Sequence, residues 1–359
     1  IFATRLSGGS YPQGAEIAAP AGFDGYGDSG ASLAGNGSFA AAAWVRQSAS
    51  LPGKAAGQTL SSAEQALLMN GTEIVAAVLS GTSWTATRLT NNASPDLAPV
   101  VASNGSTVIV AWRSVYSGNA EDLINFSQQD HILYSIYNGT DTGWSEPKQL
   151  YNGTSGAVRG IGAAMLSDGT AAVTYALDTD DTDNSSGDYE IGYTIVSTAG
   201  DPSFSAIITQ NEWLDENPRI AAVKFEPNDE RFVLGWHSVR DGLNDIRLTA
   251  VDGSGALSNS FIESIAQAAG GNAVNIDGNF RFARMNGSLN DLANLSILWS
   301  ESEGNDAGET DHGILRAVKF IEDAAGMRIS AALDVAELPE RTLTDHFDAY
   351  VSGADGKTV

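Results

Sequence analysis

The chain has 359 residues, with 44 Asp and Glu against 19 Lys and Arg, and its formal net charge at pH 7 is −25. This acidic excess disfavours nucleic acids and anionic membrane surfaces as partners, because both are bound through basic surface. The absence of cysteine excludes disulfide frameworks, cysteine-ligated metals and thiol catalysis. No apolar run approaches the ~20 residues of a membrane span, so no membrane insertion is expected.

Residues 1–19 contain two short strand patterns, and a Gly-rich link then leads to five similar repeats. Each repeat has four runs of β-branched, aromatic and small apolar residues, named strands A to D, between turns of Gly, Asn and Asp. The predicted strands are 31–34, 39–46, 73–80 and 84–90; 99–102, 107–114, 131–137 and 144–150; 160–166, 170–177, 189–196 and 204–209; 219–225, 231–238, 245–251 and about 257–265; 281–285, 294–302, 312–320 and 328–335.

One helix is predicted in the long connection between strands B and C of the first repeat. The segment Ser61-Ser62-Ala63-Glu64 has the pattern of a capping box, and Gly71 is placed to end a short helix through residues 67–69.

An aromatic residue recurs in strand B of every repeat, at intervals of 61 to 68 residues. These aromatic residues are Trp44, Trp112, Tyr175, Trp236 and Trp299. Because all-β repeats of this period are typical of propellers, we predict a single all-β domain over residues 1–359, a β-propeller of four-stranded blades. The five complete blades are placed at about 30–90, 98–150, 160–210, 218–266 and 280–336.

The chain opens with patterns of strands C and D and closes with a strand A at 346–352 and the start of a strand B. Residues 345–359 plus 1–19 are therefore predicted to share a closing blade, which makes six blades and removes open sheet edges. Seven blades are the alternative, because the last strand B stops at Val359. A chain that starts at Ile1 is also expected to be a processed or excised piece.

The connections between strands B and C are the long ones, and in a propeller they share one face with the connections between strands D and A. Long loops on a rigid scaffold are where function concentrates, so this B–C loop face is the predicted ligand-binding face. Its candidate residues are Trp112, Arg113, Trp236, His237, Arg240 and Glu301. The strand-B aromatics have two interpretations, packing between neighbouring sheets, which is preferred, or stacking on a sugar.

The B–C loop of the third repeat is the sharpest local feature, because it carries Asp178, Asp180, Asp181, Asp183 and Asp188. Aspartates that alternate on a short loop can converge oxygen ligands on Ca²⁺, which takes about six to eight of them. The loop departs from the EF-hand pattern, having no Gly at the sixth place and no Glu at the twelfth. A calcium site and a solvated loop of like charges are the two interpretations.

The segments SNGSTVIVAW (103–112) and NGTDTGWSEPKQL (138–150) resemble blades of the sialidase-like (BNR-type) β-propellers. The family's Asp-box, Ser-x-Asp-x-Gly-x-Thr-Trp, is not matched, since in the nearest segment, 140–144, the Trp follows the Gly directly. The Arg-Ile-Pro signature of the catalytic sialidases is also absent, because Arg219-Ile220 is followed by Ala221. Tyr189-Glu190 imitates a nucleophile pair but is accompanied by no recognisable arginine triad, so no catalytic residue is carried over.

These observations favour a non-catalytic, secreted or cell-surface propeller that binds a carbohydrate or protein ligand on the B–C loop face. We expect it to be a monomer or part of a larger surface protein, with Ca²⁺ as its one candidate cofactor. One alternative is a sialidase-like glycoside hydrolase, with two carboxylates about 5–5.5 Å apart for retention or about 6.5–9.5 Å apart for inversion. The acidic mouth of the ring opposes the anionic substrate that a sialidase would have to bind. A structural scaffold module is a third alternative.

Overall fold

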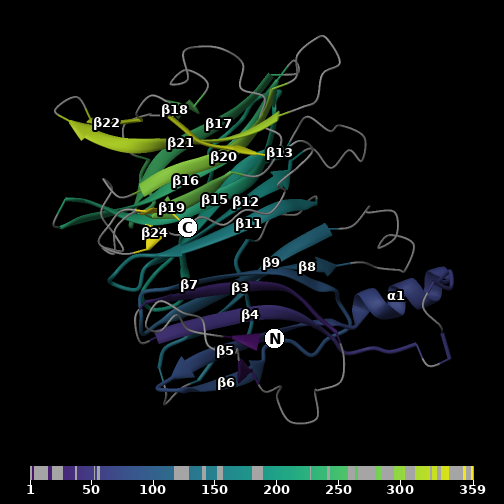
Figure 1. Ribbon diagram of the computed structural model, residues 1–359. Helices are drawn as coiled ribbons and strands as arrows, with labels where there is room; N and C mark the ends of the chain where they lie inside the picture. The colour runs from purple at the N-terminus through teal and green to yellow at the C-terminus, as the bar shows by residue number, and fades with distance from the viewer. Residues whose placement is uncertain are drawn as a thin grey trace. The chain divides into compact units, whose positions relative to one another are not determined.

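The computed structural model contains β-strands and one helix, α1, among the residues that it describes (Figure 1). The described residues are 2–3, 15–17, 27–36, 39–51, 53–54, 57–116, 129–139, 143–151, 157–179, 189–226, 228–240, 243–257, 263–265, 280–284, 295–303, 312–323, 326–329, 333–338, 351–352 and 357–358. The chain divides into two compact units, each described by itself. The first holds 1–171, 180–183 and 198–200, and the second holds 172–179, 184–197 and 201–359.

Two four-stranded antiparallel sheets lie in the first unit, each with its strands in chain order. Sheet 1 consists of β3 (Asp28–Asn36), β4 (Phe39–Gln47), β5 (Thr72–Ser80) and β6 (Ser83–Arg88). Sheet 2 consists of β7 (Asp96–Ser103), β8 (Val108–Tyr116), β9 (Gln129–Tyr137) and β10 (Lys148–Gln149). These eight strands correspond to strands A to D of the first two predicted repeats.

The remaining large sheets keep the same strand order. Sheet 3 consists of β11 (Val158–Met165), β12 (Ala171–Asp178), β13 (Tyr189–Val196) and β14 (Pro202–Ile207). Sheet 4 consists of β15 (Leu214–Glu226), β16 (Asp229–Arg240), β17 (Leu243–Asp252) and β18 (Glu263–Ser264). Sheet 5 consists of β19 (Arg281–Arg284), β20 (Leu295–Glu303), β21 (His312–Asp323), β22 (Gly326–Ile329) and β23 (Leu333–Leu338).

The predicted strand D is the element that the structure corrects. In sheet 2 the expected strand over 144–150 is reduced to β10 and a single bridge from Trp144 to Tyr137. Pro147 lies between these two contacts and cannot donate to a strand ladder. In sheet 5 the expected strand over 328–335 is two strands, β22 and β23, which pair with different parts of β21.

The predicted capping box is confirmed at the start of α1 (Ser62–Asn70). The Glu64 N–H donates to the Ser61 hydroxyl at 3.3 Å, and the Ser61 N–H donates to the Glu64 carboxylate at 2.8 Å. The Ser61 N–H and, after it, the Lys54 ammonium lower the pKa of Glu64 to about 2. The charged carboxylate at this end also complements the helix dipole.

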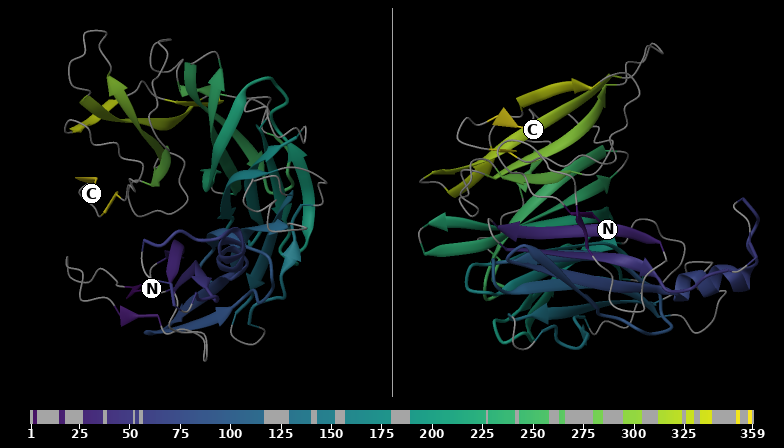
Figure 2. Two further views of the ribbon diagram at one scale, coloured as in Figure 1. Left: turned by 90° about the vertical axis from the view of Figure 1, so that its right-hand side faces the viewer. Right: turned by 60° about the horizontal axis from the view of Figure 1, so that its bottom comes forward.

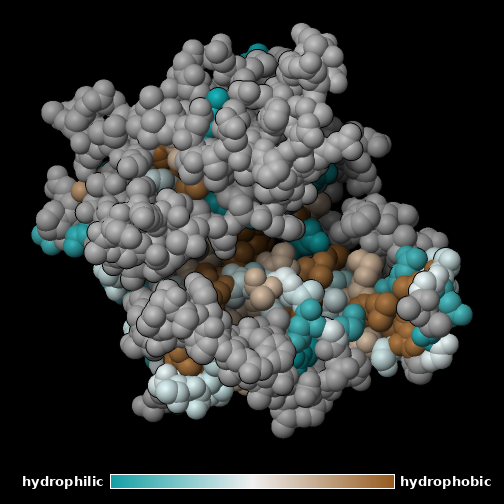
Figure 3. All heavy atoms as spheres, in the orientation of Figure 1, coloured by the Kyte–Doolittle hydropathy of each residue, from teal (hydrophilic) through white to brown (hydrophobic). Residues whose placement is uncertain are grey.

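Helix α1 lies beyond the strand ends of sheet 1, as Figure 2 shows. Its buried residue, Ala66, packs with Val115 of β8. Leu67 of the same helix is 49% exposed. Apolar residues are also seen on the surface in this region of Figure 3. The connection between strands B and C of the first repeat thus contains a helix that packs on β8 of sheet 2.

In both units a strand-B tryptophan packs against the preceding sheet. Trp112 of β8 belongs to a core cluster with residues of β4 and β5. Trp299 of β20 belongs to a cluster with residues of β15, β16 and β17. Trp44 of β4 follows the same rule, because its cluster includes Ile17, the residue after β2 (Ala15–Glu16).

The two ends of the chain form separate two-stranded pairs. β1 (Phe2–Ala3) pairs with β2, and β24 (Val351–Ser352) pairs with β25 (Lys357–Thr358). Strands are therefore present in both halves of the predicted closing blade, and a closing blade shared between the termini stays a prediction.

Candidate functional site

The strand-B aromatics are completely buried. Trp44, Trp112, Tyr175, Trp236 and Trp299 are each 0% exposed. The rings therefore pack in the core, as the preferred interpretation holds. Trp112 and Trp236 present no ring face on which a sugar could stack, which corrects their assignment to the ligand-binding face.

An aspartate near the start of strand A accepts the indole N–H of the strand-B tryptophan. The pairs are Trp44–Asp28 at 3.1 Å, Trp112–Asp96 at 3.0 Å and Trp236–Asp215 at 3.1 Å. A buried indole N–H needs such an acceptor. In sheet 3 the aromatic is Tyr175, and its hydroxyl is paired with that of Thr194 at 3.1 Å instead.

Strand A has a β-bulge directly after each of these aspartates. The backbone φ is +60° at Gly30, +50° at Ala98 and +52° at Asn217, each two residues beyond the aspartate. The pairing register between strands A and B shifts at the same places. Because a bulge re-aims the side chains beside it, this backbone feature accounts for a strand residue reaching the buried indole.

An asparagine in the connection from strand D to strand A links two sheets. The Asn211 N–H donates to Glu190 Oε1 at 2.8 Å, and its Nδ2 donates to Asp215 Oδ2 at 2.8 Å. The equivalent residues in the first unit are Asn92, Glu73 and Asp96, with distances of 3.2 and 3.1 Å. Each asparagine Oδ1 also accepts the N–H two residues ahead, which closes an Asx turn.

This network has a sequence signal that the strand patterns do not reveal. The motif Asn-x-x-x-Asp-x-x-Pro occupies residues 92–99 and 211–218. Its asparagine lies in a connection and its aspartate lies in a strand. A search for strand patterns or for turn patterns therefore does not find the two residues together. Only the folded chain brings the asparagine to a carboxylate of strand C.

The pKa values of the aspartates that accept the indole N–H are shifted in different directions. Burial raises the pKa of Asp96 and of Asp215, although neutral hydrogen-bond donors act against it. At Asp28 burial acts in the same direction and is the largest single effect, but hydrogen bonds and positive charge, those of Arg46 first among them, together outweigh it and the pKa is lowered; Arg46 Nε donates to Asp28 Oδ1 at 2.6 Å. The strand-B residue two positions after the tryptophan therefore decides whether the aspartate sits in an ion pair.

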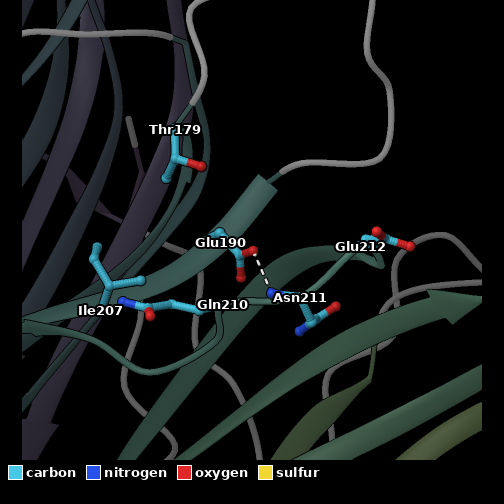
Figure 4. Close-up of a pocket in the computed structure, with 6 residues that line it drawn as sticks. All are labelled: Thr179, Glu190, Ile207, Gln210, Asn211 and Glu212. Carbon is cyan, nitrogen blue, oxygen red and sulfur yellow. Dashed lines mark hydrogen bonds between the residues drawn. The ribbon is translucent and has the colours of Figure 1, made fainter.

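A cavity of about 490 Å³ opens where β13 begins and β14 ends (Figure 4). It is lined by Thr179, Glu190, Ile207, Gln210, Asn211 and Glu212. These residues come from the end of strand B, the start of strand C, the end of strand D and the connection to the next strand A. That is the edge of a sheet where the sequence places the ligand-binding face, and all six residues belong to the second unit.

Glu190 is the buried member of this lining, at 5% exposed, while residues 210–212 are exposed. Figure 4 shows its carboxylate directed toward the Asn211 N–H, with Glu212 on the far side of Asn211. Carboxylate, amide and hydroxyl groups together offer both acceptors and donors, and Ile207 supplies an apolar wall. The cavity is suited to a ligand rich in hydroxyl or amino groups.

The other predicted face residues make contacts within the protein. Arg113 Nη1 donates to the Val158 carbonyl at 3.1 Å, and its Nε lies 3.7 Å from Asp130. His237 Nε2 lies 3.1 Å from Asn244 Oδ1. Glu301 is in β20, and its side chain lies outside the described residues.

Arg240 is exposed and stacks on Trp213, with its guanidinium carbon 5.1 Å from the ring centroid. Arg247 approaches the same ring at 4.3 Å. Two cation–π contacts hold this indole beside the cavity residue Glu212. Arg240 thus contacts Trp213, the residue directly after the cavity residues 210–212.

The calcium prediction falls almost entirely outside the described residues. Asp178 is the last residue of β12, and Asp180, Asp181, Asp183 and Asp188 are not described. Within the described part of the chain, no group of three or more His, Asp or Glu side chains is arranged to hold a metal ion. The Ca²⁺ site therefore remains a prediction.

No protein-family model matches the chain, and no curated protein matches it. Similar solved structures include a Trypanosoma rangeli sialidase in complex with sialic acid, at 10% identity over 91% of this chain with a TM-score of 0.45. The Hadza microbial sialidase Hz136 is 11% identical over 81% of this chain, with a TM-score of 0.47. The catalytic domain of a Coprinopsis cinerea GH62 α-L-arabinofuranosidase is 14% identical over 79% of this chain and 87% of its own, with a TM-score of 0.36.

This chain spans 56% of the length of each sialidase chain. In the described part of the chain, α1 is too short and too polar to cross a membrane.

Proposed function

We propose that this chain is a secreted or cell-surface β-propeller that binds a carbohydrate ligand without catalysing a reaction. The supporting observation is the cavity at the start of β13, lined by hydrogen-bonding groups around the buried carboxylate of Glu190. A few polar groups that converge in a concave site are the usual mark of a small-ligand site. Its position at the B–C and D–A edge of sheet 3 is where propeller ligands are expected.

The propeller architecture is part of this proposal, with six blades, or seven, and a closing blade formed by 345–359 and 1–19. It is supported by contacts that repeat in one direction along the chain. The Tyr134 hydroxyl of strand C donates to Gly200 O at 3.0 Å in the first unit. The Tyr193 hydroxyl of the next strand C donates to Gly255 O at 2.6 Å in the second unit. Both acceptors lie in the turn between strands C and D of the following repeat, as stacked blades require.

The decisive experiment is a glycan array run in parallel with a panel of chromogenic glycosides. We expect binding to one glycan class and no hydrolysis. Gln210→Ala and Glu190→Gln should each weaken that binding by about tenfold, the loss expected for one hydrogen bond to or from a buried site. Thr85→Val, on the exposed edge strand β6, is the matched control and should leave binding unchanged.

The glycoside hydrolase stays as a second candidate because two carboxylates, Glu190 and Glu212, line the same cavity. Hydrolysis that is abolished by Glu190→Gln would favour it over a binding role. If no glycan is bound and none is hydrolysed, a structural scaffold module becomes the better account.

A further inference from the structure

We propose that Asn138 is a site of spontaneous deamidation, at which the protein gains a carboxylate as it ages. The proposal is independent of the carbohydrate-binding function and concerns the turn between strands C and D of sheet 2. It comes from comparing the Asn-Gly pairs that the structure describes in full, 70–71, 104–105 and 138–139. Asparagine is a thermolabile residue, and a glycine after it leaves the backbone open to reaction.

The reaction needs only the chain itself and water. The backbone nitrogen of the glycine attacks the side-chain carbonyl carbon, Cγ, of the asparagine, and the side-chain nitrogen leaves as ammonia with the proton of the glycine N–H. Water then adds to one carbonyl of the resulting succinimide ring and opens it to aspartate or isoaspartate, with no oxidation or reduction. Ring closure therefore requires an asparagine amide that is free to turn and a glycine nitrogen that is not held elsewhere.

Asn104 is protected because hydrogen bonds hold both reacting groups. Its Oδ1 accepts the Thr107 N–H at 2.9 Å, and its Nδ2 donates to the Ser167 carbonyl at 3.2 Å. The N–H of Gly105 donates to Ser103 Oγ at 2.9 Å. An asparagine that closes a turn with its own side chain in this way must break several hydrogen bonds before it can react.

Asn70 is protected by the end of the helix. It is the last residue of α1, and the N–H of Gly71, the C-cap residue, donates to the Leu68 carbonyl at 3.2 Å. Gly71 is buried, and a Cβ placed on it would lie 2.6 Å from the side chain of Ala49. The glycine nitrogen therefore cannot turn toward the asparagine side chain without breaking the cap.

Asn138 lacks both kinds of restraint. It is exposed and directly follows β9, and its side chain makes no hydrogen bond in the part of the chain that the structure describes. Gly139 has a φ of +103°, and a Cβ placed on it would meet no described atom within 4 Å apart from those of its chain neighbours. Among these Asn-Gly pairs, 138–139 is thus the pair in which the fold leaves the reaction open.

The conversion changes the main chain between two residues that are in contact. Tyr137 and Trp144 form a β-bridge, and their ring centroids lie 5.5 Å apart. Isoaspartate adds an atom to the main chain inside this turn, and either product adds a negative charge. The turn follows the C-terminal end of β9, whereas the B–C connection leads into its N-terminal end, so ligand binding on the B–C loop face should not change.

Peptide mass spectrometry of the full chain, incubated in mildly alkaline buffer, tests the proposal. We expect deamidation at Asn138 to be at least about tenfold faster than at Asn104 or Asn70, because the hydrogen bonds at those two places must break first. The same chain kept unfolded in denaturant is the control. There the three pairs should react at similar rates, since the fold no longer restrains any of them.

Two variants connect the new charge to this residue. Isoelectric focusing of the incubated wild type should show a more acidic species that grows with time. Asn138→Gln should suppress this species, because the longer side chain closes a ring with the next nitrogen far more slowly. Asn70→Gln is the matched control and should leave the growth of the species unchanged.

Each other result overturns the proposal. Equal rates at Asn138 and Asn104 in the folded chain would show that the hydrogen bonds do not select the site. An acidic species that persists in Asn138→Gln would place the reaction elsewhere in the chain. A glycan on the Asn138 amide, which lies in an Asn-Gly-Thr acceptor triplet, would mean that the amide is used for another modification.

Discussion

Ala98 lies in the repeated bulge and has a strained backbone conformation. Its φ is +50°, in the left-handed region, whereas the equivalent position in sheet 1 is Gly30. We expect Ala98→Gly to raise the free energy of unfolding by about 1 kcal/mol, since a Cβ is disfavoured there by roughly that amount. Denaturant unfolding measures the change.

The matched control is Ala86→Gly, in the regular edge strand β6. It should lower the free energy of unfolding by about 0.5–1 kcal/mol, because glycine loses more conformational freedom in a strand. Destabilisation by both substitutions would contradict the strain at Ala98.

The buried aspartates predict opposite pH dependences within one repeated position. Burial raises the pKa of Asp96 above its ordinary value of 3.8, so the folded state binds more protons than the unfolded state in the pH range between the two values. Stability is then fully present below the ordinary value and is lost as pH rises through the raised pKa. The Asp96→Asn variant lacks this titration, so wild type should lose stability relative to it as pH rises from the ordinary value of 3.8 through the raised pKa.

Asp28 provides the internal control, because its pKa is lowered: burial raises it, but hydrogen bonds and positive charge, those of Arg46 first among them, together outweigh burial. Here stability is present above the ordinary value and is lost as pH falls through the lowered pKa. Wild type should therefore lose stability relative to Asp28→Asn on acidification. If the unfolding free energies of both variants run parallel to that of wild type across the pH range, the opposite pKa shifts of Asp96 and Asp28 are refuted.

At the scale of elements, the N-terminus of α1 depends on its capping box. Ser61→Ala removes the hydroxyl that accepts the Glu64 N–H, and a lost cap of this kind costs about 1 kcal/mol of helix stability. We expect hydrogen exchange of the α1 amides to quicken by about fivefold, the factor that corresponds to this energy. Ser62→Ala, one position inside the helix, keeps the cap and should not quicken exchange; equal effects would rule the cap out.

The sequence predicts most strands correctly because turns of Gly, Asn and Asp bound them sharply. β13 is predicted to the residue, at 189–196. Strand D fails, since it lies at a sheet edge where a single feature such as Pro147 can end the pairing. The cavity was also beyond prediction, because its lining comes from separate segments around Thr179, Glu190 and 207–212, and no local pattern contains them all.

At the scale of the whole molecule, the strand-B tryptophans pack in the same direction along the chain. Trp112 and Trp299 each pack on the sheet that precedes their own. A stack of this kind needs something to cover the exposed side of its first sheet, and Ile17 provides part of that cover for Trp44. The role of residues 1–19 as half of a closing blade stays a prediction, and the contact between Ile17 and Trp44 is the place to test it.

Ile17 therefore tests whether the N-terminal segment is part of the fold or only rests on it. Ile17 is 1% exposed, and Ile17→Ala should lower the free energy of global unfolding by about 2–4 kcal/mol through the lost contacts and the cavity left beside Trp44. Leu33→Ala, at a β3 position that is 69% exposed, removes a similar volume and should change stability by less than about 0.5 kcal/mol. Denaturant unfolding compares the two, and equal small effects would mean that the segment opens independently of sheet 1, against a blade that is shared between the termini.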